Sequence, residues 1–208
     1  MPMKPASSPI LLFILIGTTR LFGLLRSLIL ANIWGSGEEA AAFELAQNLS
    51  TFLYDTLIST VLSAMFIPAY VQKQDAASRD CFISTLILPI FAIGAILYLP
   101  LILFPKGTLS LAACGISPSL LIKTAPTLSV LSLGRVTLSL SCLFVGVLQS
   151  EGAELKAALY YCVSSGVSLL TAAVLPQFLT AFTLSALLAL LDIALLFALS
   201  RSILRRHS

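Results

Sequence analysis

Long apolar runs separated by short polar segments are the feature of this 208-residue sequence that most limits how it can fold. Six such runs cover residues 9–34, 43–71, 81–104, 127–149, 155–175 and 178–200. A helix needs roughly 20 apolar residues to cross a bilayer, and every run reaches that length. Only 10% of the residues are charged, against about 25% in soluble domains. We therefore predict an all-α integral membrane protein, in which residues 1–208 form a single lobe of six transmembrane helices.

The charges in the connecting segments predict an orientation. Lysine and arginine are enriched in the cytoplasmic loops of membrane proteins. If the N-terminus is cytoplasmic, only Lys106 and Lys123 fall outside, and seven basic residues fall inside: Lys4, Lys73, Arg79, Lys156, Arg201, Arg205 and Arg206. We therefore expect both termini to be cytoplasmic. The basic C-terminal segment RSILRR is typical of a stop-transfer anchor, and binding of anionic lipid headgroups is the alternative.

Five charged residues lie within the apolar runs: Arg20, Arg26, Asp55, Arg135 and Asp192. A charge facing lipid is costly, so each should face protein or a water-filled cavity. Arg20 and Arg26 are six residues apart, which separates them by about 120° around a helix. They can both border a wide cavity, and Gly23 between them would allow another helix or a substrate to approach closely.

Three runs carry polar residues at helical spacing. The second contains Glu44, Asn48, Thr51, Asp55, Ser59 and Ser63, and the fourth contains Ser132, Arg135, Ser139, Cys142, Gly146 and Gln149. Such stripes form either helix–helix contacts or the wall of a hydrated cavity. The central charges favour a cavity for these two runs. The fifth run has Tyr161, Ser164, Ser165 and Ser168 without a charge, which favours packing.

The intramembrane charges sum to three arginines and two aspartates. A slightly cationic cavity suits an anionic or phosphate-bearing substrate. Asp55 and Asp192, with the nearby polar residues Asn48 and Ser59, are candidates for tuning the cavity charge or for coupling transport to an ion. Asp192 could instead serve to neutralise an intramembrane arginine.

The sequence contains no pattern that indicates catalysis or a cofactor. A P-loop, a Ser/His/Asp set and an HExxH motif are all missing, and His207 is the only histidine. The four cysteines lack the CxxC spacing of metal sites and are typical of small apolar residues. We therefore expect neither an enzyme nor a metal site, and no nucleic acid as a partner.

The segment TRLFGLLRSLILANIWGSG resembles the first helix of the MurJ/MviN family of lipid II flippases, part of the MOP exporter superfamily. Arg20, Gly23 and Arg26 match the family pattern there, followed by the turn at Trp34–Gly37. The later segment SAMFIPAY, at residues 63–70, resembles the end of the family's second helix. Beyond residue 71 the match lies mainly in the layout of the helices.

This resemblance implies one lobe of a transporter in the bacterial cytoplasmic membrane. The family exports a polyprenyl-pyrophosphate-linked peptidoglycan precursor by alternating access, and its first-helix arginines engage the pyrophosphate. Arg20 and Arg26 would inherit that role, with Arg135 as a further candidate. Members have about fourteen helices in two lobes around a cavity, so we expect a second lobe from a separate chain or from another copy of this one.

Two other functions remain open from the sequence. Many members carry a pair of arginines in the second helix where this chain has Tyr54 and Asp55. That difference favours a small-solute or drug exporter of the same superfamily. A shortened, non-transporting membrane scaffold is the second alternative.

Overall fold

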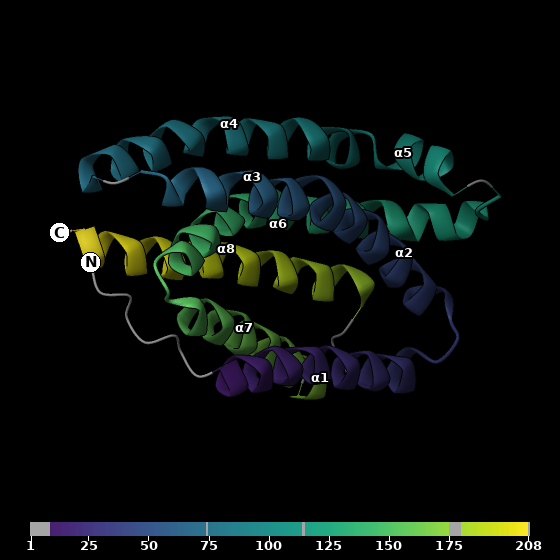
Figure 1. Ribbon diagram of the computed structural model, residues 1–208. Coiled ribbons are helices and arrows are strands. Elements are labelled where there is room, and N and C mark those ends of the chain that lie inside the picture. The colour runs from purple at the N-terminus through teal and green to yellow at the C-terminus, as the bar shows by residue number, and fades with distance from the viewer. Residues whose placement is uncertain (1–8, 74, 114, 175–179, 208) are drawn as a thin grey trace.

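The computed structural model describes residues 9–73, 75–113, 115–174 and 180–207, and these residues form helices joined by short connections (Figure 1). The helices are α1 (Pro9–Trp34), α2 (Glu38–Leu53), the π-helical segment η1 (Tyr54–Ser59), α3 (Thr60–Val71), α4 (Ala76–Leu103), α5 (Pro105–Ala112), α6 (Pro118–Ser150), α7 (Glu154–Val174) and α8 (Ala181–His207).

The predicted all-helical membrane fold is confirmed, and its helices follow the apolar runs closely. Five described helices are long and apolar enough to cross a membrane: α1, α4, α6, α7 and α8. The second predicted span consists of α2, η1 and α3, which follow one another without a break. None of these three pieces reaches a spanning length alone, so the structure counts five spans and one composite span.

Helix α6 lies at the centre of the lobe and contacts α2, α3, α4, α5, α7 and α8. Small residues allow these close approaches, as is typical of helix contacts in membranes. A Cβ added to Gly134 would lie 2.7 Å from the Cα of Ala189 in α8, and one added to Gly146 would lie 2.9 Å from the Phe66 ring in α3. Gly94 of α4 meets Ser139 in the same way.

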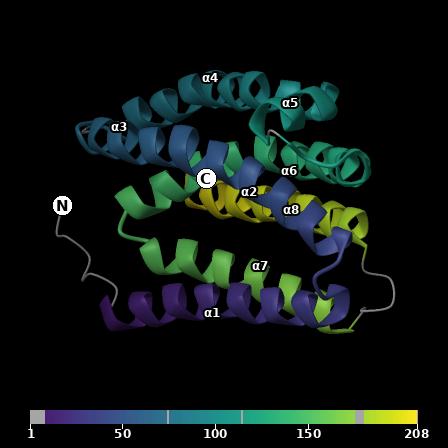
Figure 2. The same cartoon turned by 90° about the vertical axis from the view of Figure 1, so that its right-hand side faces the viewer.

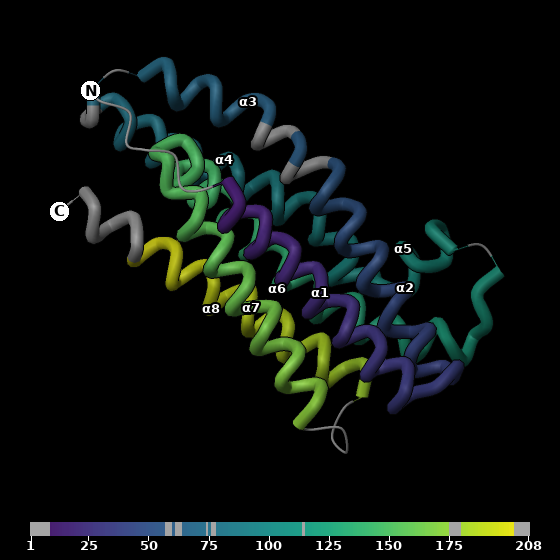
Figure 3. Tube along the Cα trace, turned by 60° about the horizontal axis from the view of Figure 1, so that its bottom comes forward, coloured from purple at the N-terminus to yellow at the C-terminus, as the bar shows by residue number. Residues whose placement is uncertain are grey.

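Helix α1 packs mainly against α7 and forms a layer with it below α6 and α8 (Figure 2). The two helices run side by side along their length (Figure 3). Ser165 donates a hydrogen bond to the carbonyl of Thr19, at 3.2 Å, and Gly166 faces the ring of Phe22. Most of the remaining surface of α1 is apolar and exposed, including Phe13 at 78%.

Polar contacts hold the two ends of the lobe. At one end, Lys123 lies 2.8 Å from Oε2 of Glu38, and Ser119 donates a hydrogen bond to Oε1 of the same carboxylate at 2.9 Å. The hydrogen bonds from Lys123 and Ser119, together with the charge of Lys123, lower the pKa of Glu38. At the opposite end, Tyr70 donates to Glu151 at 3.0 Å.

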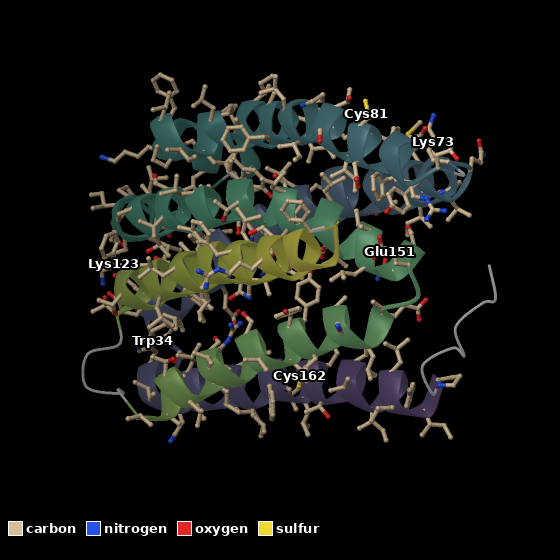
Figure 4. All side chains as sticks on the ribbon, turned by 90° about the vertical axis from the view of Figure 1, so that its left-hand side faces the viewer. Trp34, Lys73, Cys81, Lys123, Glu151 and Cys162 are labelled. Carbon is tan, nitrogen blue, oxygen red and sulfur yellow. The ribbon has the colours of Figure 1, made fainter. Side chains whose placement is uncertain are left out.

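The labelled residues in Figure 4 show this separation, with Lys73 and Glu151 near one end and Trp34 and Lys123 near the other. The grouping agrees with the loops that the charge pattern assigns to each side. Which end faces the cytoplasm stays a prediction.

Candidate functional site

A cavity of about 460 Å³ lies between α1, the composite second span, α6 and α7. Its charged lining residues are Arg20, Asp55 and Arg135. The full lining is Ile16, Thr19, Arg20, Thr51, Tyr54, Asp55, Phe66, Arg135, Leu138, Cys142, Val145, Gly146, Gln149, Ala158 and Tyr161. Three residues that the sequence marked as intramembrane charges therefore share one space.

The two charged polar stripes meet at this cavity. The second span contributes Thr51 and Asp55, and α6 contributes four residues of its stripe, at steps of seven, four and three: Arg135, Cys142, Gly146 and Gln149. Other members of the α6 stripe have a packing role, because Ser132 and Ser139 are fully buried. The α6 stripe therefore contains both cavity-lining and fully buried residues.

The Arg135 guanidinium is held between the second span and α8. One nitrogen donates to Thr51 Oγ1 at 3.1 Å, and another lies 3.9 Å from a carboxylate oxygen of Asp192. The Nε of Arg135 is buried and has no hydrogen-bond partner. Asp192 does not line the cavity, so its contact with Arg135 places it behind the wall as a neutralising charge.

Arg26 joins three helices instead of lining the cavity. Its guanidinium donates to Ser168 of α7 at 3.1 Å and to Gln47 of α2 at 3.5 Å. Both acceptors are neutral, and the Nε of Arg26 is also buried without a partner. Among the described residues, only neutral groups hold Arg26, and an arginine held in this way inside a membrane retains a strong attraction for an anion.

A second cavity of about 460 Å³ lies between the C-terminal half of α1 and the start of α2. Its lining includes Asn48, Gln47 and Glu44, together with Trp34 and the turn at Gly35–Gly37. On α1, the first cavity uses residues 16–20 and the second uses residues 27–34. The two cavities therefore occupy opposite halves of the helix, with Arg26 between them.

Of the predicted site residues whose side chains the structure describes, Arg26, Asp192 and Gly23 lie outside both cavities. Gly23 lines neither, and a Cβ added there would meet no atom within 4 Å. The backbone of Ser59 belongs to η1, but its side chain lies outside the described residues.

The sequence interpretation missed Tyr54 and Tyr161, which both line the first cavity. Tyr161 and Ser168 belong to the uncharged stripe of the fifth run, which was expected to serve packing alone. Their helical spacing was the available signal, because that face of α7 turns toward α1 and the cavity. In the part of the chain that is described, no cluster of three or more His, Cys, Asp or Glu residues could hold a metal ion.

The family model for the lipid II flippase MurJ matches residues 30–199, which is most of the chain. The chain belongs to the MurJ family. The match extends far beyond residue 71, after which the sequence motifs had shown a resemblance to the family mainly in the layout of the helices. It begins after Arg20 and Arg26, so the assignment of these two residues depends on the motif at residues 19–26 and on their position in the structure.

A solved structure supports the fold of this MurJ family member. It is a MOP superfamily transporter from Pyrococcus furiosus, described as having a binding pocket of reversed polarity that suggests a different function. The TM-score is 0.80 at 13% sequence identity, covering 96% of this chain and 44% of that one. This chain thus has the fold of a MOP transporter over less than half of that protein's length. No curated protein sequence matches it significantly.

Proposed function

We propose that this chain forms one lobe of a flippase that moves a polyprenyl-pyrophosphate-linked peptidoglycan precursor across the bacterial cytoplasmic membrane by alternating access. The observation that carries the proposal is the cavity in which Arg20 and Arg135 face a shared space inside the predicted bilayer. Family membership supports the same substrate class.

The arginines have unused binding capacity. Arg20 makes no ion pair or side-chain hydrogen bond with the described residues, and Arg135 has one carboxylate at 3.9 Å and a free buried Nε. Guanidinium groups bind phosphate oxygens through charge-assisted, often bidentate hydrogen bonds. A phosphate group entering the cavity would therefore find Arg20 and the Nε of Arg135 as donors that no described residue already uses.

A pathway between lobes needs a second lobe opposite this cavity. We propose that a separate polypeptide or a second copy of this chain supplies it, and that both termini face the cytoplasm. The exposed apolar surface of α1 leaves room for such a contact or for lipid.

The test is translocation of lipid II in proteoliposomes. The protein would be purified from its native membrane together with any associated lobe, and lipid II would be followed by its accessibility to a reagent outside the vesicle. We expect Arg20→Ala combined with Arg26→Ala to reduce the rate at least about tenfold, because the cavity loses one cation that can bind the phosphate group and the first helix loses a second positive charge that attracts it. Membrane insertion should persist.

Lys106→Ala provides the matched control, because this exposed cation lies in α5 and lines neither cavity. Its translocation rate should equal that of the wild type. Wild-type rates in the double variant would contradict the proposed role of the first-helix arginines.

A further inference from the structure

Among the described residues, Asp55 is the one acidic residue that lines the first cavity, where it shares the wall with Arg20 and Arg135. Arg135 is already engaged by Thr51 and Asp192. Within the described part of the chain, the Asp55 carboxylate makes no ion pair and no side-chain hydrogen bond. Its side chain is exposed to the cavity instead of being used to neutralise an arginine.

The backbone of Asp55 is held by an irregular stretch of helix. The main-chain N–H of Thr60 bonds to the carbonyl of Asp55, five residues back, and the Thr60 hydroxyl donates to the same carbonyl at 2.7 Å. This is the hydrogen-bond pattern of a π-helix, which occurs in short pieces, frequently at functional sites. Nearby, the fully buried Tyr98 donates to the carbonyl of Ser50 at 2.9 Å and ties α2 to α4.

An unpaired carboxylate weakens a site that binds only anions. It repels the same phosphate that Arg20 and Arg135 attract, and it is itself costly inside a membrane. A ligand that carries a positive group beside its phosphate removes both costs. The cavity also presents neutral hydrogen-bonding groups on Tyr54, Tyr161 and Gln149 between the charges.

We propose that Asp55 forms a cation subsite that binds a primary amine on the ligand whose phosphate is held by Arg20 and Arg135. The substrate class is then a zwitterionic lipid-linked precursor with a free amine in its headgroup. At about 460 Å³ the cavity holds only part of such a headgroup, so the phosphate and the amine would be its principal contacts. This inference rests on the proposed function, since it assigns a second subsite to the same cavity.

Binding of three lipids to the detergent-solubilised protein tests the subsite. The probes are lipid II with a free amine on its stem peptide, the same lipid with that amine acetylated, and undecaprenyl pyrophosphate. Native mass spectrometry would give their relative affinities. We expect the wild type to bind the amine-bearing lipid about tenfold more tightly than the acetylated lipid, because only the amine can pair with Asp55.

Variants test whether Asp55 causes the preference for the amine-bearing lipid over the acetylated lipid. Asp55→Asn should bind both lipid II forms equally, and Asp55→Glu should retain the preference because it keeps the charge. Glu44→Gln is the matched control, since Glu44 is an acidic residue of the same composite span but lines the second cavity. It should leave the preference unchanged.

The outcomes separate the two proposals. Equal binding of the amine-bearing and acetylated lipids by the wild type would overturn the cation subsite and leave the proposed function standing. A preference that survives in Asp55→Asn would also overturn it. If none of the three lipids binds, the proposed function fails and the subsite fails with it.

Discussion

At the scale of single residues, Arg135 is bound by a weak set of contacts for a cation inside a membrane. Its side chain is 16% exposed, that of Asp192 is 18% exposed, and the closest ion-pair distance is 3.9 Å. At that distance, and in a partly hydrated environment, the electrostatic attraction between the two charges is weaker than in a fully buried pair. The remaining donors of Arg135 are shared between Thr51 and the cavity.

Removing the acidic partner should destabilise the lobe. We expect Asp192→Asn to lower the free energy of unfolding by about 1–3 kcal/mol, because it leaves the Arg135 charge in the membrane without a counter-charge. Thermal unfolding in detergent would measure the change. Combining it with Arg135→Gln should cost less than the sum of the two single variants, because the second change removes the unpaired charge. Strict additivity would show that the two side chains do not interact.

The sequence predicted which charged residues lie inside the membrane. It did not predict which of them line the cavity and which contact other helices. Arg20, Asp55 and Arg135 line one cavity. Arg26 differs, because Ser168 and Gln47, which lie 142 and 21 residues from it in the chain, hold it between α1, α2 and α7. Contacts of that kind depend on which helices become neighbours, and a helical period on one segment carries no such information.

At the scale of elements, apolar length located the spans well and irregular structure poorly. The predicted span at residues 9–34 has the same bounds as α1. The π-helical segment η1 and the short helix α5 were not foreseen. A π-helix adds one residue per turn without changing the apolar character of the chain, so the apolar pattern could not reveal it.

The close crossing of α6 and α8 depends on Gly134, which has no side chain. We expect Gly134→Ala to destabilise the lobe by about 1–3 kcal/mol, because its Cβ would lie 2.7 Å from the Ala189 backbone and the helices would have to separate. Gly17→Ala in α1 is the control, since its Cβ would meet nothing within 4 Å. That change should be neutral or slightly stabilising, because alanine favours a helix over glycine. Equal unfolding temperatures for the two variants would contradict the close crossing.

At the scale of the whole molecule, the lobe consists of a bundle around α6 and a flanking pair formed by α1 and α7 (Figure 2). The first cavity lies where the pair meets the bundle, and the second lies where α1 leaves α7 to reach α2. Arg26 is the polar link between the pair and α2. Movement of α1 and α7 relative to α6 would therefore change both cavities together.

The orientation of this arrangement decides which cavity opens to the cytoplasm. The distribution of lysine and arginine predicts that the ends of α3 and α8 lie inside and that α5 lies outside. The first cavity, which reaches Phe66 and Gln149 near the ends of α3 and α6, would then open toward the cytoplasm. This is the side from which a newly made precursor would enter.

Cysteine labelling tests the orientation directly. In a background where all four cysteines are replaced, Asp75→Cys would mark the connection before α4 and Lys106→Cys would mark α5; both positions are exposed. We expect a membrane-impermeant maleimide to label Lys106→Cys in intact spheroplasts, and Asp75→Cys only after the membrane is permeabilised, because seven of nine loop and terminal basic residues would otherwise lie outside. The opposite labelling pattern would show that the lobe has the inverse orientation, in which the cavity that contains Arg20, Asp55 and Arg135 faces the outside.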